Sequence, residues 1–263
     1  MLLENKFAVV VGGGQTPGET IGNGRATAIQ FAREGATVVV GDINVTSAEE
    51  TVEMIAAEGG TGFALAVDVC AEDSVRSFVD ESIELLGRID ILHNNVGVSL
   101  AAGDAVIDEI TSDAFDHLVA LNLRSMVYTC KHVLPHMRRQ GSGAIINISS
   151  MAAWAAYPYV AYKTTKAGVI ALTEQLAQAN AQHGIRANVI LPGLMNTPMA
   201  IESRISASTS REQVVAARDQ RVPLGRKMGS AWDVAHAAAF LASERAGFIT
   251  GVSLPVDGGA SVS

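Results

Sequence analysis

Short runs of valine, isoleucine and other apolar residues alternate with longer amphipathic stretches along most of the chain. Each run is apolar throughout, which is typical of strands buried on both faces of a sheet. Strands that alternate with helices predict βαβ units, and so a parallel sheet covered by helices. The seven expected strands span residues 7–11, 37–40, 62–67, 89–93, 144–148, 187–191 and 253–256.

The stretches between the strands have the length and periodicity of helices. They span residues 24–34, 47–58, 71–86, 112–140, 161–183 and 231–242. Right-handed crossovers would join these elements into one doubly wound α/β sheet of the Rossmann type. No linker or internal repeat divides the sequence, so we expect residues 1–263 to form a single dinucleotide-binding and catalytic domain. Residues 199–229 have weak helical periodicity and mixed charges, which predicts a substrate lid.

Charge and cysteine content exclude several classes of function. Asp and Glu number 27 against 19 Lys and Arg, and this net charge of −8 disfavours a nucleic-acid partner. No apolar run approaches the roughly 20 residues that span a bilayer, and residues 1–6 precede a strand-like run rather than a signal-peptide core. Two distant cysteines, Cys70 and Cys130, indicate no disulfide framework. We therefore expect a cytoplasmic protein with no membrane partner.

Glycines are concentrated between the first strand and the first helix, over residues 12–24. Glycine lets the backbone turn sharply and approach a pyrophosphate, and the N-terminus of the following helix favours its negative charge. A nucleotide site at this position is therefore the functional interpretation, and an ordinary glycine-rich turn is the structural alternative.

The second expected strand ends at Asp42. An acidic residue at this strand end can accept hydrogen bonds from both ribose hydroxyls and would repel a 2′-phosphate. Asp42 lies 18 residues beyond Gly24, close to the separation expected of a dinucleotide site. We expect Arg25 to lie along the first helix and not to reach the strand end. These positions predict NAD rather than NADP as the cofactor.

Further motifs follow along the chain, most of them at or just beyond the ends of the later strands, and one, Tyr162 with Lys166, in an expected helix. In chain order they are Asp68-Val69, Asn94-Asn95-Val96-Gly97, Ile148-Ser149-Ser150, Tyr162 with Lys166, Pro192-Gly193, Thr197-Pro198-Met199 and Val256-Asp257-Gly258-Gly259. With Asn122 in the central helix, this series resembles the short-chain dehydrogenase/reductase family over essentially the whole chain. The resemblance implies hydride transfer between a nicotinamide cofactor and a secondary alcohol or ketone. It also implies a homotetramer that pairs helices 112–140 and 161–183 across subunits.

The resemblance also implies a set of cofactor contacts. They are Gly12, Ile21, Gly22, Gly24, Asp42, Asp68, Val69, Asn95, Gly97, Tyr162, Lys166, Pro192, Gly193 and Thr197.

The glycine motif is longer than the family's Gly-x-x-x-Gly-x-Gly. We favour an alignment in which Gly12, Gly22 and Gly24 act and residues 15–20 are an insertion, because Gly24 leads directly into the helix. The alternative keeps the spacing with Gly12, Thr16 and Gly18. The insertion is either a surface bulge or a source of hydroxyl contacts to the pyrophosphate.

Oxidation of an alcohol requires a base for the hydroxyl proton, because the nicotinamide carries only the hydride. The pKa of free tyrosine is near 10, so the phenolate needs a nearby cation, and a lysine one helical turn further on supplies it. Tyr159 with Lys163 and Tyr162 with Lys166 both have this spacing. We choose Tyr162 and Lys166, because Tyr159 follows a proline and is expected to precede the helix.

A serine should donate a hydrogen bond to the substrate oxygen. Counting back from Tyr162 by the family's usual spacing gives Ser149, whereas the strand end gives Ser150, and neighbours on a strand point to opposite faces. We favour Ser150. The resemblance implies that Asn122 is the fourth catalytic residue, which would interrupt or pin the central helix and hold a water that links Lys166 to solvent.

The substrate pocket is expected to be largely apolar, with walls that include Trp154, Tyr157, Tyr159, Met195 and Met199. This composition favours a cyclic or aromatic secondary alcohol. No metal site is expected, since His132 and His136 lack the acidic residue of a metalloprotease pattern. A 3-oxoacyl or other carbonyl reductase is the alternative enzyme. A non-catalytic nucleotide sensor is a remote alternative, because such proteins typically lose the tyrosine or the lysine.

Overall fold

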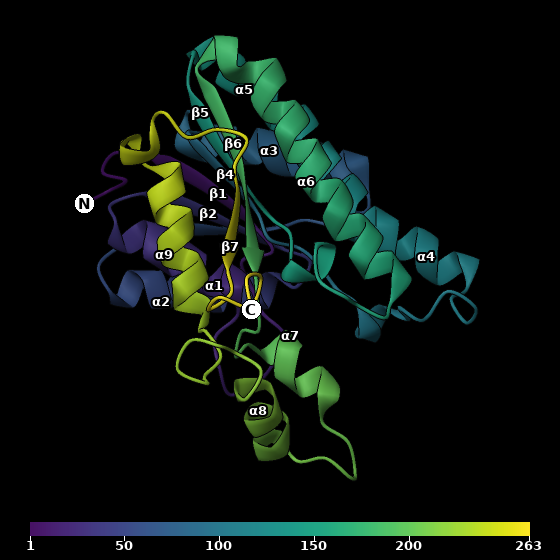
Figure 1. Cartoon of the computed structure of the whole chain (residues 1–263). Helices are drawn as coiled ribbons and strands as arrows, with labels where there is room; N and C mark the ends of the chain where they lie inside the picture. Colours follow the sequence, from purple (N-terminus) through teal and green to yellow (C-terminus); the bar gives the residue numbers. More distant parts are fainter.

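The computed structural model describes residues 1–263 and contains one seven-stranded, all-parallel sheet (Figure 1). Its strand order is β3-β2-β1-β4-β5-β6-β7. The strands are β1 (Phe7–Val11), β2 (Thr37–Asp42), β3 (Thr61–Ala66), β4 (Ile91–Asn94), β5 (Gly143–Ile148), β6 (Ile185–Pro192) and β7 (Ser253–Val256). The predicted doubly wound α/β fold is confirmed, with each strand within two residues of its expected bounds at either end.

Helices cover both faces of this sheet (Figure 1). On one face lie α1 (Asn23–Arg33), α2 (Val45–Ala57) and α9 (Ala231–Ala242), and on the other lie α3 (Glu72–Leu86), α5 (Ser125–Gln140) and α6 (Val160–Asn180). Alternate residues of each strand supply the two cores. Val10 and Val38 pack with α1 and α9, while Val9 and Val39 pack with α3 and α5. Burial on both faces explains the uniformly apolar runs.

The long helix expected over residues 112–140 is interrupted. The structure has α4 (Ser112–Val119), one π-helical turn (Ala120–Arg124) and then α5. Asn122 lies in the π-helical turn and is fully buried. Such turns are rare and occur frequently at functional sites, which draws attention to this side chain.

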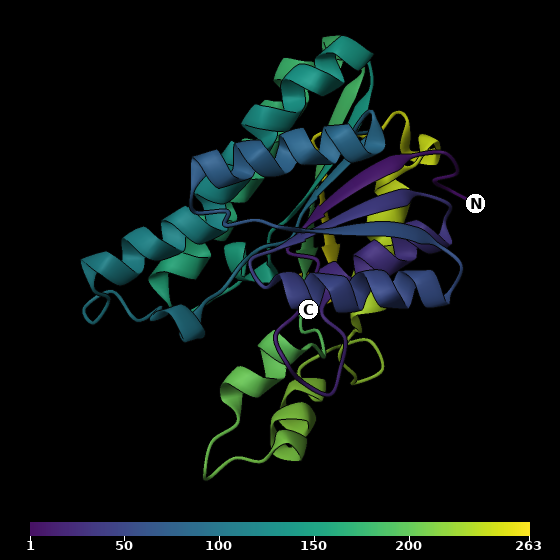
Figure 2. The ribbon, with the colours of Figure 1, turned by 180° about the vertical axis from the view of Figure 1, so that it is seen from behind.

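Two short helices, α7 (Pro198–Ile201) and α8 (Arg211–Asp219), extend beyond the carboxyl ends of the strands (Figure 1). They occupy the region in which the sequence predicts a lid. The loop between β1 and α1 descends beside them, as Figure 2 shows from behind. No helix has the length and apolar character required to cross a membrane.

Candidate active site

A cavity of about 940 Å³ opens at the carboxyl ends of the strands. One wall comes from the loop after β1, including Gln15, Thr16 and Pro17. The opposite wall comes from residues 195–203, which contain the start of the lid region. Between these walls lie the ends of β2, β4, β5 and β6 and the first turns of α6. This edge of an open parallel sheet is where α/β proteins bind their ligands.

Two glycines bring the loop and helix α1 into direct contact. A Cβ atom on Gly24 would lie only 1.9 Å from the carbonyl oxygen of Gly12, and Gly12 itself has φ of +81°. Neither position tolerates a side chain. Helix α1 begins immediately after Gly22, whereas Gly18 lies against Pro198. Gly22 and Gly24, rather than Gly18, therefore flank the helix N-terminus.

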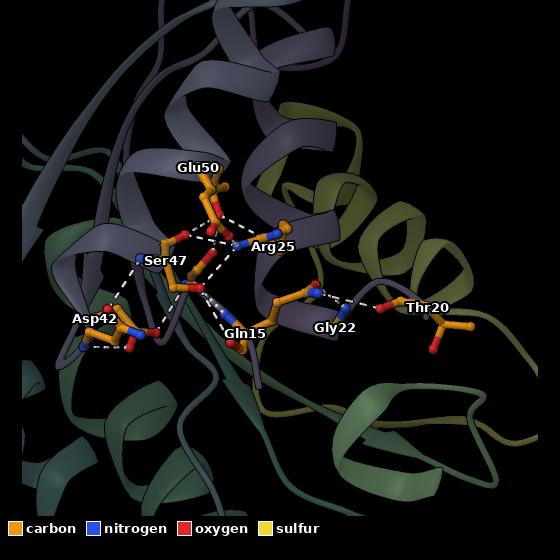
Figure 3. A network of polar contacts seen from close by, with 11 residues as sticks. Gln15, Thr20, Gly22, Arg25, Asp42, Ser47 and Glu50 are labelled. Atoms are coloured by element: carbon orange, nitrogen blue, oxygen red, sulfur yellow. Dashed lines mark hydrogen bonds and ion pairs between the residues drawn. The ribbon is translucent and has the colours of Figure 1, made fainter. Parts of the chain in front are cut away.

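Gln15 connects the two ends of the insertion to the fold (Figure 3). Its backbone N–H donates to Ser47 Oγ at 2.9 Å, and its side-chain Oε1 accepts from the N–H of Gly22 at 2.9 Å. Its Nε2 also reaches the carbonyl oxygen of Thr20. Gln15 thus fastens the insertion to Ser47 on α2 and to Gly22, the N-cap of α1. No local sequence pattern predicts this role, because Ser47 is distant in the sequence.

Arg25 does not lie along α1 as expected. Its guanidinium crosses to α2, where it donates to Ser47 and Thr51 and pairs with Glu50 at 2.7 Å (Figure 3). The side chain is buried, so these contacts hold it behind the loop. Arg25 is therefore engaged by α2 and is not among the residues that line the cavity.

Asp42 is fixed at the end of β2 by two backbone donors. Its Oδ2 accepts from the N–H of Gly14 and its Oδ1 from the N–H of Asn44, both at 3.0 Å. The residue lines the cavity, as does Asp68 at the end of the neighbouring strand β3. Lys166 is the only lysine or arginine in the cavity wall, and it comes from α6. The β2 end is therefore acidic.

Tyr162 and Lys166 lie one turn apart on α6, and both line the cavity. Lys166 Nζ is 5.7 Å from the centroid of the Tyr162 ring and donates to the carbonyl oxygen of Ile148 at 2.9 Å. Burial lowers the pKa of Lys166 to about 7. Burial also raises the pKa of Tyr162 to about 12, and this rise is opposed by a hydrogen bond from Ser150.

The competing pair is arranged differently. Tyr159 is the residue before α6, outside the first helical turn. Lys163 points its ammonium group at three backbone carbonyl oxygens, those of Ala152, Ala153 and Ala155. Neither residue lines the cavity.

The two candidate serines also differ in their partners. Ser149 is buried and donates to the carbonyl oxygen of Lys166 at 2.6 Å. Ser150 interacts instead with the Tyr162 hydroxyl, and its own Oγ accepts from the N–H of Ala152 at 3.1 Å. Only Ser150 thus has its hydroxyl beside that of Tyr162.

Asn122 holds the loop that follows β4. Its Oδ1 accepts from the N–H of Val98, and its Nδ2 donates to the carbonyl oxygen of Val98, each at 2.8 Å. Nδ2 also reaches Thr165 Oγ1 on α6 at 3.3 Å. Asn122 lies behind the cavity wall rather than in it, next to Gly97, where a Cβ atom would lie 2.7 Å from Lys166 Nζ.

Most of the predicted site residues come together in this cavity. All predicted cofactor contacts except Ile21 line it, and Ile21 packs against buried residues of the core instead. Of the expected substrate-pocket residues, Met195 and Met199 line the cavity. The structure places Trp154, Tyr157 and Tyr159 outside the lining. Sequence analysis did not single out several other lining residues, among them His117 and Leu121.

Tyr157 still contacts Tyr162. Its ring centroid is 5.6 Å from that of Tyr162, and its hydroxyl lies 3.0 Å from Ser99 Oγ. Trp154 is half exposed. Trp154, Tyr157 and Tyr159 all precede α6, and of the three only Tyr157 packs against Tyr162.

The loop and helix N-terminus fit a dinucleotide. The glycine contact leaves backbone next to the cavity where side chains would block a pyrophosphate. The buried Thr20 Oγ1 and Asn23 Oδ1 in this region have no hydrogen-bond partner within the protein. Further polar partners are expected for such atoms. This fold and site define a dinucleotide-binding oxidoreductase.

Comparison with known proteins identifies the family. Residues 19–261 match the family model described as enoyl-(acyl carrier protein) reductase. The uncharacterized oxidoreductase YxbG of Bacillus subtilis is 38% identical over 261 residues, which are 98% of this chain and 91% of YxbG. The 2,5-dichloro-2,5-cyclohexadiene-1,4-diol dehydrogenase LinX of Sphingobium indicum is 34% identical over 263 residues, with coverage of 99% and 98%.

A solved structure gives the same result. The crystal structure of a protein from Burkholderia xenovorans, assigned to the short-chain dehydrogenases/reductases, superposes with a TM-score of 0.90 at 37% identity. The match covers 99% of this chain and 98% of that one. The chain belongs to the short-chain dehydrogenase/reductase family, whose members are oxidoreductases that use nicotinamide cofactors.

Proposed function

We propose that this protein is an NAD(H)-dependent oxidoreductase that interconverts a secondary alcohol and a ketone, with Tyr162 as the general acid/base. The observation that carries the proposal is the placement of Tyr162, Lys166 and Ser150 in one cavity whose other end contains Asp42. The nicotinamide ring supplies hydride transfer when the cofactor is bound. The protein must therefore bind the two reactants and move one proton.

Tyr162 is proposed to hold that proton on its hydroxyl oxygen. In the oxidation direction the phenolate accepts the alcohol proton, and in the reduction direction the phenol returns a proton to the carbonyl oxygen. Ser150 donates a hydrogen bond to the same substrate oxygen and stabilises negative charge there.

Lys166 favours the phenolate when it is charged. Burial alone raises the pKa of Tyr162 and lowers that of Lys166, so a buried phenolate needs a nearby positive charge. We propose that Lys166 supplies it and also contacts the nicotinamide ribose. Asn122 acts as a positioning residue in this proposal. It holds Val98 in the loop after β4 and Thr165, the neighbour of Lys166, on α6.

NAD is preferred over NADP in this proposal because the β2 end is acidic. Gly14 and Asn44 each donate a backbone N–H to the Asp42 carboxylate, which orients it beside the cavity. A 2′-phosphate would meet the Asp42 charge, and no lysine or arginine lines that part of the wall.

The proposed substrate is a cyclic or aromatic secondary alcohol or its ketone. Met195 and Met199 give the substrate end of the cavity an apolar wall. The relative LinX is named for a cyclic diol, which supports a ring-shaped substrate. The alternative is a 3-oxoacyl or other carbonyl reductase. The match to a family model of acyl-carrier-protein reductases favours it, whereas the net charge of −8 disfavours binding of an acidic carrier.

We also propose that residues 1–263 act as one domain with a lid at 199–229, as a cytoplasmic homotetramer. Exposed apolar side chains on α4 and α5, Phe115 and Val127, support pairing through these helices.

The proposed function is tested with a panel of cyclic and acyclic secondary alcohols and their ketones. Nicotinamide absorbance is followed with NAD and NADP separately. Turnover of cyclic alcohols with NAD is expected. Turnover of acyl thioesters but not of alcohols would overturn the proposed substrate class. Turnover with NADP but not with NAD would overturn the proposed cofactor preference.

A further inference from the structure

The insertion touches the lid. A Cβ atom on Gly18 would lie 2.8 Å from Pro198 Cβ and 3.1 Å from Glu202 Cγ. The backbone of the insertion therefore packs directly against the start of the lid, as the neighbouring loop and helices in Figure 2 indicate. A side chain at Gly18 would separate the two segments.

Arg211 lies between two carboxylates at this contact. Its Nη1 is 3.3 Å from Glu19 Oε2 in the insertion, and its Nε is 3.5 Å from Glu202 Oε1 in the lid. The Arg211 side chain is 20% exposed, Glu202 is 28% exposed and Glu19 is 74% exposed. One guanidinium thus joins an exposed carboxylate to a largely buried one.

Unpaired polar atoms are concentrated in the same region. Eight buried side-chain nitrogen or oxygen atoms in the chain have no hydrogen-bond partner, and two of them belong to His93. The remaining six belong to Thr20, Asn23, Asn196, Glu202 and Arg211, and two of these atoms, Arg211 Nε and Glu202 Oε1, form the 3.5 Å ion pair without reaching hydrogen-bond geometry. Buried polar groups without partners are costly, so this contact has unused capacity to bind polar groups and to tighten.

The contact lies beside the cavity, because the segments on either side of it contribute lining residues. Gln15 and Thr16 of the insertion line one wall, and Ala200, Glu202 and Ser203 of the lid region line the other. The base of the insertion is itself fixed to α2 and α1 by Gln15. A link from its tip to the lid therefore ties the lid to the proposed cofactor-binding elements.

We propose that Arg211 fastens the lid to the insertion beside the cavity by bridging Glu202 and Glu19, and that it thereby acts as a positioning residue for the cofactor-binding walls. The bridge delays release of the bound dinucleotide, because one wall must separate from the other before the cofactor leaves. This inference rests on the proposed function only in requiring that the cavity bind a nicotinamide dinucleotide. It assigns the insertion a role other than a surface bulge.

The test measures release of NADH rather than turnover. NADH bound to the full-length protein is displaced by excess NAD⁺ in a stopped-flow instrument, and the loss of bound-NADH fluorescence gives the dissociation rate. Glu19→Gln and Arg211→Gln are expected to release NADH about two- to five-fold faster, the range for a partly exposed ion pair. Arg211→Lys should retain most of the wild-type rate, because it keeps the charge.

Two further results distinguish a bridge from a general structural effect. The double variant Glu19→Gln/Arg211→Gln should release NADH no faster than Arg211→Gln, since both substitutions break the same contact. Added salt should accelerate release from the wild type more than from Arg211→Gln. The control is Glu244→Gln, which breaks an exposed 2.7 Å ion pair with Lys6. Lys6 directly precedes β1, at the end of the sheet away from the cavity, so this variant should release NADH at the wild-type rate.

Unchanged release from Glu19→Gln and Arg211→Gln would overturn the inference, as would equal acceleration in Glu244→Gln. If Arg211→Gln does not fold, Glu19→Gln decides, because its side chain is largely exposed. If only NADPH binds, the same measurement is made with NADPH, and the NAD preference alone fails. If neither binds, both this inference and the proposed function fail.

Discussion

Lys166 lies one helical turn beyond Tyr162 on α6, with its Nζ 5.7 Å from the centroid of the tyrosine ring. Lys166 is fully buried and Tyr162 partly buried, and burial shifts each pKa toward the neutral form, to about 12 for the phenol and about 7 for the ammonium group. A charged Lys166 would offset the cost of the Tyr162 phenolate, so the protonation states of the two residues are coupled.

This coupling predicts the pH dependence of alcohol oxidation. The reaction needs the phenolate, so kcat/KM should rise with pH until Tyr162 is ionised. Lys166→Met removes the favourable charge, and the rising limb should move to higher pH by about one unit or more. The measurement is kcat/KM from pH 6 to about 10, with Lys163→Met as the matched control. If kcat/KM of Lys166→Met rises over the same pH range as that of the wild type, the proposed role of Lys166 is contradicted.

Ser150 and Ser149 should behave differently when each is changed to alanine. Ser150→Ala removes a donor to the substrate oxygen and should lower kcat by about 100-fold. Ser149→Ala removes a buried hydrogen bond to the carbonyl oxygen of Lys166, which should cost about 1 kcal/mol of stability and leave kcat within about threefold. Steady-state kinetics and thermal unfolding of both variants make the comparison. The reverse ranking of kcat would assign the catalytic role to Ser149.

Asp42→Asn should reduce the preference for NAD. The substitution removes the charge that repels a 2′-phosphate and weakens the contact with the ribose hydroxyls. The ratio of kcat/KM for NAD to that for NADP should fall about tenfold or more. Asp68→Asn is the control. The family resemblance implies that Asp68 contacts the adenine, which both cofactors share, so its loss should leave the ratio unchanged. An unaltered ratio in Asp42→Asn would show that specificity arises elsewhere.

His93 should make the fold sensitive to acid. It is fully buried, neither ring nitrogen has a partner, and burial lowers its pKa to about 3. Between that value and about 6.5 the unfolded chain binds a proton that the folded protein does not, so the free energy of unfolding falls as the pH is lowered.

The expected contribution of His93 is about 2 kcal/mol between pH 7 and 5. Denaturant unfolding of the wild type and of His93→Leu at these two pH values isolates it from the carboxylates. The loss of stability on acidification should be smaller in His93→Leu. An equal loss in the two proteins would show that His93 takes up a proton without unfolding.

The sequence predicted the sheet and most of the cavity because both depend on local patterns. Apolar runs define strands that are buried on both faces, and motif residues at strand ends meet at one edge of a parallel sheet. Asp42 is of this kind, whereas Tyr162 and Lys166 are predicted from their spacing of one helical turn on α6. The structure places all three in the cavity wall.

Other features depend on contacts between distant parts of the chain. The pairing of Glu19 with Arg211 joins residues that lie far apart in the sequence, and no local pattern indicates it. The path of Arg25 toward Glu50 and the position of Tyr157 outside the cavity likewise follow from how helices and loops pack. The pattern of apolar residues defines which segments are buried, but not which side chains meet.

The proton-transfer role of Tyr162 is tested most directly by comparing Tyr162→Phe with Tyr159→Phe. NADH formation from a cyclic secondary alcohol is followed at saturating NAD, after circular dichroism has shown that both variants are folded. Tyr162→Phe should lower kcat by about 1,000-fold, whereas Tyr159→Phe should stay within about threefold of the wild type. Near-normal turnover in Tyr162→Phe with loss of turnover in Tyr159→Phe would contradict the assignment of Tyr162 as the acid/base.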